Sequence, residues 1–133
     1  MRSADMDQRR KFSARVFLSA GIYGFVTLVP QYFLEGKLER DFPPPLTHPE
    51  HFYGFIGVAL AWQFVFLIIA HDVQRYRLFM LPGILEKLSF GVAMLVLYGQ
   101  CRVPAFVAGA GIIDLLFAVF FVLALRASRS LEM

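Results

Sequence analysis

Residues 104–125, PAFVAGAGIIDLLFAVFFVLAL, decide the fold class of this chain. The stretch is 22 residues long and carries one charged side chain, Asp114, near its centre. A helix rises about 1.5 Å per residue, so about 20 apolar residues are enough to cross the hydrocarbon core of a bilayer. The stretch is therefore predicted to form a transmembrane helix.

Three more apolar segments precede it, at residues 12–34, 52–70 and 78–98. Strands exposed to lipid could not satisfy their backbone hydrogen bonds, and four segments are too few for a closed barrel, so helices are expected. The composition agrees, because 58% of the residues are hydrophobic and 17% are charged, which is outside the range of soluble domains. We predict an all-α fold, a single integral membrane four-helix bundle over residues 1–133 with a proline-rich loop at 35–51.

The distribution of basic residues predicts the orientation of these helices. Nine of the 13 Lys and Arg residues lie in the N-terminal segment, the second loop and the C-terminal tail, and three lie in the first and third loops. Because short cytoplasmic segments retain Lys and Arg, both termini are predicted to be cytoplasmic and the proline-rich loop external. This predicts a multi-pass protein of the cell inner membrane, with the lipid bilayer as its surroundings. The net charge of +3 follows from the same asymmetry and gives no reason to expect nucleic acid as a partner,.

Prolines and small residues indicate where the helices bend and touch. Pro30, near the end of the first helix, and Pro82, early in the third, are expected to kink the backbone. Small residues spaced four apart let helices approach closely in lipid. The candidate pairs are Ala20 with Gly24, Gly57 with Ala61, and Ala105 with Gly109.

Four polar side chains interrupt the last three apolar segments: Gln63, Glu86, Lys87 and Asp114. Asp114 lies 12 residues from both Arg102 and Arg126, so it is about 18 Å along the helix from either boundary. Gln63 and Glu86 fall within about one helical turn of the same depth. Charges exposed to lipid there would be costly, so these side chains are expected to face one another and are a candidate ligand or proton site.

The charges of this layer do not balance, because two carboxylates accompany one ammonium group. Lys87 is expected to pair with Asp114, since its neighbour Glu86 points about 100° away on the same helix. Glu86 would then be protonated, because burial disfavours the charged form, or would bind a cation or a basic ligand. Two functions stay open: binding or moving a proton or small ligand, or a structural ion pair that fixes packing in a homo-oligomer or with a partner membrane subunit.

Histidines and known motifs add little to this interpretation. His48, Glu50 and His51 are weak candidates for an external metal site, since their spacing matches no specific motif. The sequence has no Walker loop, nucleophile elbow, HExxH or glycine-rich dinucleotide motif,. We therefore predict no metal site and no cofactor, and find no positive case for an enzyme.

Three short stretches carry a resemblance to known proteins: THPE at residues 47–50, YGFIGVALAWQ at 53–63 and LEK at 85–87. Together they resemble a pattern in small bacterial membrane proteins of uncharacterised function. In size and four-helix layout the chain is also similar to the DoxX-like families. The resemblance implies a bacterial inner-membrane protein and adds no substrate or mechanism.

Overall fold

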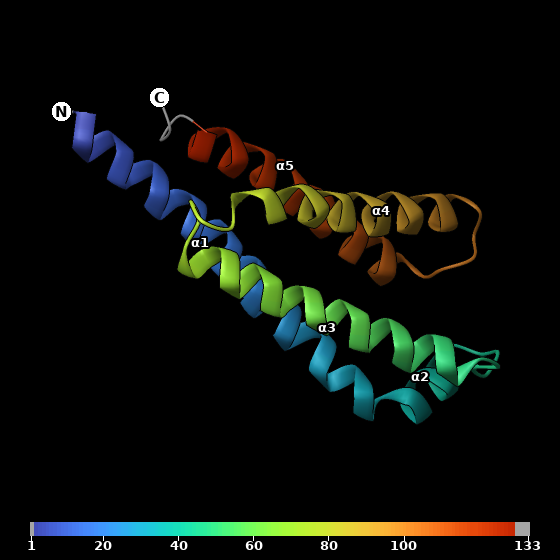
Figure 1. Ribbon diagram of the computed structural model, residues 1–133. Helices are drawn as coiled ribbons and strands as arrows, with labels where there is room; N and C mark the ends of the chain where they lie inside the picture. The colour runs from blue at the N-terminus through green and yellow to red at the C-terminus, as the bar shows by residue number, and fades with distance from the viewer. Residues whose placement is uncertain (1, 130–133) are drawn as a thin grey trace.

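The computed structural model describes residues 2–129, and all regular secondary structure in this range is helical (Figure 1). Four segments are long and apolar enough to cross a membrane, which confirms the predicted all-α class and number of candidate spans. These candidate spans are Ser3–Phe33, Pro49–His71, Arg77–Gly99 and Ala105–Arg129. The helices are α1 (Arg2–Leu28), α2 (Glu35–Asp41), α3 (Pro49–His71), α4 (Met80–Gly99) and α5 (Ala105–Arg129), with short 3-10 helices η1 (Val29–Phe33) and η2 (Arg77–Phe79).

Helix α1 begins at Arg2, well before the apolar segment expected from residue 12. Two ion pairs stabilise the added polar turns, and each joins residues one turn apart. They are Asp5 with Arg9 at 3.0 Å and Asp7 with Lys11 at 2.6 Å,. Residues 2–11 are mostly polar, so the hydropathy of the sequence predicted that the helix begins only at residue 12.

The two prolines behave differently. Pro30 lies in η1, where the α-helical hydrogen bonding of α1 has already ended, as expected for a residue without a backbone N–H. Pro82 lies in the first turn of α4, where a missing N–H costs nothing,. The expected kink near Glu86 is therefore wrong, and α4 runs without a break from Met80 to Gly99.

Residues 35–51 are more ordered than the expected loop, because α2 occupies their first part. The Tyr53 hydroxyl donates a hydrogen bond to the Glu35 carboxylate, which ties α2 to the start of α3. The Phe42 ring, directly after α2, lies 5.0 Å from the ring of Phe106 at the start of α5. The helical part ends just before the run of three prolines, which cannot continue a helix,.

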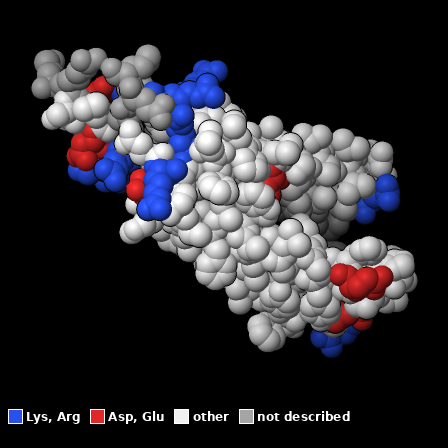
Figure 2. Space-filling view, in the orientation of Figure 1, with Lys and Arg blue, Asp and Glu red and all other residues white. Residues whose placement is uncertain are grey.

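The long helices form two pairs, α1 with α3 and α4 with α5 (Figure 1). Both termini lie at one end of the molecule, where α1 also packs against α5 and the pairs converge. Toward the α2 end the pairs diverge, and α3 and α4 contact each other at few points. Figure 2 shows a notch between the two pairs at this end, and blue Lys and Arg atoms gathered mainly at the end with the termini.

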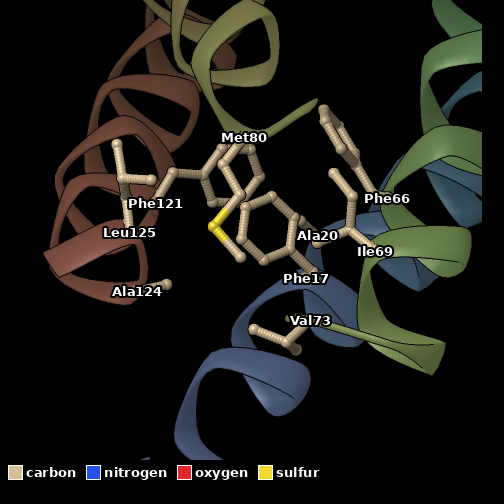
Figure 3. Packing of buried hydrophobic residues seen from close by; sticks show 9 residues of the cluster. All are labelled: Phe17, Ala20, Phe66, Ile69, Val73, Met80, Phe121, Ala124 and Leu125. Atoms are coloured by element: carbon tan, nitrogen blue, oxygen red, sulfur yellow. The ribbon is translucent and has the colours of Figure 1, made fainter. Parts of the chain in front are cut away.

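The converging end holds the main apolar core (Figure 3). Phe17 stacks on Phe121 with ring centroids 4.1 Å apart, and Phe66 meets Phe121 edge-on at 5.0 Å. The buried Ser13 hydroxyl donates to the Ala124 carbonyl at 3.1 Å, so α1 and α5 are also joined by a hydrogen bond. We call Phe17, Phe66 and Phe121 the aromatic core.

Glycines allow two close helix contacts. A Cβ on Gly91 of α4 would lie 2.8 Å from the carbonyl oxygen of Gly111 on α5, so these backbones nearly touch. A Cβ on Gly24 of α1 would overlap the Gln63 side chain of α3. By contrast, no described atom lies within 4 Å of a Cβ built on Gly109, so the expectation that Gly109 mediates a contact is wrong. Gly91 and Gly111 were missed because they lie on different helices and form no spaced pair within one segment.

Candidate functional site

The site centres on Lys87, whose side chain is only 3% exposed. Its Nζ lies 3.2 Å from Asp114 Oδ1 and 3.4 Å from Glu86 Oε2. The structure thus has the expected Lys87–Asp114 pair. It also brings Glu86 to the same ammonium, although the neighbours diverge at their Cα atoms, because the long Lys87 side chain reaches between the two acids. We call Glu86, Lys87 and Asp114 the charged cluster.

Two helices supply the charged cluster, and their close approach explains why it forms. Lys87 lies one turn before Gly91 on α4, and Asp114 lies three residues after Gly111 on α5. Since these glycines let the two backbones nearly touch, the ammonium can reach across to the carboxylate,. On its other side Nζ lies 5.3 Å from the centroid of the Phe66 ring, a favourable position for a cation,.

Glu86 differs from its two partners in exposure and in hydrogen bonding. Its side chain is 19% exposed, against 3% for Lys87 and 8% for Asp114. Its Oε2 is buried and accepts no hydrogen bond within the described part of the chain. Glu86 is therefore the member of the cluster with bonding capacity left over.

Gln63 is 1% exposed and occupies the opposite wall, on α3. Its Nε2 donates to the Ala59 carbonyl at 2.8 Å, which fixes the orientation of the amide because a carbonyl can only accept,. Its Oε1 points toward Gly24 and finds no donor among residues 2–129. The predicted polar layer is thus split: three members form one cluster, and Gln63 stands apart with a free acceptor.

A cavity of about 900 Å³ separates these two walls. It is lined by residues from α1 to α5, and the charged ones among them are Glu86, Lys87 and Asp114. These three, with Tyr23 and Gln63, line its inner end, whereas Leu38, Phe52 and Phe106 line it near α2. This cavity could not be predicted from the sequence, since an apolar residue that faces a cavity looks the same as one that faces lipid.

The inner end of the cavity is closed by the aromatic core. Phe66 lies beneath the Lys87 ammonium, and a Cβ on Gly83 would be 3.1 Å from the Phe66 ring. Toward the α2 end, two ring pairs bridge the helix pairs: Phe55 with Phe90 at 5.8 Å, and Phe42 with Phe106 at 5.0 Å. The cavity is therefore closed toward the termini by the aromatic core, and two aromatic ring pairs border it toward α2, but it is not enclosed.

The weak metal candidates lie far from the charged cluster, at the start of α3. His48, Glu50 and His51 can bring one ligand atom each to within 4.8 Å of one another. All three are exposed, and His48 Nδ1 lies 3.0 Å from Glu50 Oε1, a hydrogen bond that accounts for part of this proximity. The absence of a metal site stays a prediction.

No protein-family model, curated protein or solved structure matches the chain. The resemblance to small bacterial membrane proteins of DoxX-like layout therefore stays a prediction. The function has to be inferred from the geometry of the cavity and the charged cluster.

Proposed function

We propose that this chain is a multi-pass inner-membrane protein, with both termini in the cytoplasm, that binds a small amphiphilic molecule in its cavity. The polar end of the ligand lies at the charged cluster and its apolar body lies along the cavity walls. The observation that carries the proposal is the cavity of about 900 Å³ that ends at Glu86, Lys87 and Asp114.

The cavity has the usual properties of a small-molecule site. Its volume lies within the range of about 300–1,000 Å³ that is common for ligand pockets, and a few convergent polar groups at one end accompany apolar and aromatic walls,. A purely structural charged cluster needs no such space beside it.

Binding is a better proposal than passage of a proton across the membrane. Passage would need polar groups on both sides of the charged cluster. On the side of the termini the next layer is the aromatic core, with Phe17 and Phe66 fully buried. That layer supports a site that is reached from one side.

A structural role is the second candidate, and one observation favours it for part of the cluster. Lys87 and Asp114 are buried within a single chain and bonded to each other, so this pair holds α4 against α5 without a partner subunit. The pair alone explains neither the exposure of Glu86 nor the cavity. We therefore assign packing to Lys87 and Asp114, and ligand contact to Glu86.

The test fills the cavity without changing a charge. Ala110 lines the cavity on α5, whereas Val119 is exposed on the outer side of the same helix. Purified wild type, Ala110→Phe and the matched control Val119→Phe are extracted with organic solvent, and the bound small molecules are identified by mass spectrometry. The proposal expects a molecule that copurifies with wild type and Val119→Phe and is lost from Ala110→Phe; equal amounts in all three samples would refute it.

A further inference from the structure

The charge of the cluster is unbalanced in a setting that water reaches poorly. With every group ionised, Glu86 and Asp114 carry two negative charges against the single positive charge of Lys87. A net charge beside buried apolar walls is costly, so the cluster gains stability from one more positive charge. Among the residues that line the cavity, no second Lys or Arg supplies it. The missing charge is either a proton or part of a ligand.

The unused hydrogen-bonding capacity points to the same kind of ligand. Glu86 Oε2 and Gln63 Oε1 are buried polar atoms that accept no hydrogen bond in the described range, although Glu86 Oε2 lies 3.4 Å from Lys87 Nζ. When Glu86 is ionised, both atoms can only accept. They lie on opposite walls of one cavity, on α4 and α3. A group that enters between them has to donate hydrogen bonds, which suits an ammonium and does not suit a carboxylate or a phosphate.

The remaining walls exclude a bare metal ion as the natural occupant. Hard cations such as Ca²⁺ or Mg²⁺ take about six or more oxygen ligands, and the cavity beyond the cluster is lined by side chains such as Phe55, Trp62 and Phe90. On α4 the lining extends from Glu86 to Met94, about 12 Å along the helix. This length suits an apolar body attached to the cationic group. The aromatic faces of the lining also attract cations.

We infer that the ligand is an organic amine with an apolar body, whose ammonium group lies between Glu86 and Gln63. This inference rests on the proposed ligand-binding function and adds the chemical class of the ligand. Glu86 accepts from the ammonium and supplies the neutralising charge.

The experiment compares three probes of equal chain length: decylamine, decanol and decanoate. Trp62 is the only tryptophan of the chain and lines the cavity, so its fluorescence reports occupancy directly. Titrations on the full-length protein in detergent micelles are paired with thermal midpoints. They are run on wild type, on Glu86→Gln, and on the matched control Glu50→Gln, which makes the same chemical change at an exposed carboxylate on the first turn of α3.

The inference expects decylamine to bind wild type and Glu50→Gln about tenfold more tightly than decanol, since a charge-assisted hydrogen bond is worth about that much. In Glu86→Gln this preference disappears while decanol affinity is unchanged, which also shows that the cavity is intact. If Glu86→Gln does not fold, Glu86→Met serves as a second neutral variant.

Other outcomes distinguish a failure of the amine class from a failure of ligand binding itself. Equal affinity for the amine and the alcohol in wild type, or an amine preference that survives in the neutral variants, overturns the amine class and leaves ligand binding in place. If none of the three probes changes Trp62 fluorescence or the thermal midpoint of wild type, both the amine class and the proposed function are overturned.

Discussion

The two ends of this molecule are built from the same kinds of residues and pack differently. At the end with the termini, Phe17, Phe66 and Phe121 contact one another and are fully buried. At the α2 end, Phe55 and Phe106 are about half exposed and border a cavity. Apolar side chains gain little from leaving lipid for a protein interior, so hydrophobicity alone does not close helices together in a membrane.

Small residues are buried at both ends, since Ala59 and Ala108 toward α2 are also buried, so their number alone does not separate the closed end from the open one. Ala20, Ala118 and Ala124 are all buried beside the aromatic core, where they let α1, α3 and α5 approach. Ala93 and Gly109 lie farther toward the α2 end and are at most partly buried. The comparison teaches that in this chain the position of tight packing follows backbone proximity rather than the number of apolar residues.

The sharpest test of this comparison truncates one ring at each end. Phe121→Ala removes a fully buried ring and is expected to lower the free energy of unfolding by about 3–5 kcal/mol,. Phe90→Ala removes a half-buried ring that stacks on Phe55 toward the α2 end, and it should cost less than about 1 kcal/mol,. Reversible unfolding in mixed micelles gives both values, and equal costs would mean that the two ends are equally packed.

The charged cluster lies between the two ends and should behave as a structural unit. Lys87→Met leaves the buried Asp114 carboxylate and the partly exposed Glu86 carboxylate without their cation and is expected to cost about 3 kcal/mol,. The double change Lys87→Met with Asp114→Leu is expected to cost less than Lys87→Met alone, because an apolar pair is better tolerated than an unpaired charge. Additive losses in the same unfolding assay would contradict the pairing.

The α4–α5 contact offers a smaller effect with a matched control on α5. Gly91→Ala places a Cβ 2.8 Å from the Gly111 carbonyl oxygen and 2.6 Å from Leu115 Cγ, so it should cost about 1–3 kcal/mol,. Gly109→Ala meets no described atom within 4 Å and should be neutral or slightly stabilising,. Thermal midpoints measured side by side test this, and a stable Gly91→Ala would mean that α4 and α5 can separate without loss.

The smallest effect is expected outside both ends, in the polar first turns of α1. Asp7→Asn breaks the exposed ion pair with Lys11 and should change stability by about 0.3 kcal/mol,. Helix content by circular dichroism is the suitable measurement. A large loss would show that these turns contribute to the packed core, which their exposure does not suggest.

The number of candidate spans could be predicted from the sequence, because bilayer thickness relates directly to segment length,. The Lys87–Asp114 pair could also be predicted, because an unpaired charge inside an apolar segment is costly. The cavity, the Gly91–Gly111 contact and the isolation of Gln63 could not be predicted. They depend on how helices diverge in three dimensions, and an apolar helix that faces lipid on several sides lacks the periodic pattern that would reveal its contacts.

The divergence of the two helix pairs has a mechanical consequence. In a bilayer, a molecule whose arms join at one end and spread at the other occupies more area in one leaflet than in the opposite leaflet. If the chain spans a bilayer as proposed, a change in the separation of α3 and α4 would do work against the lateral pressure of that one leaflet.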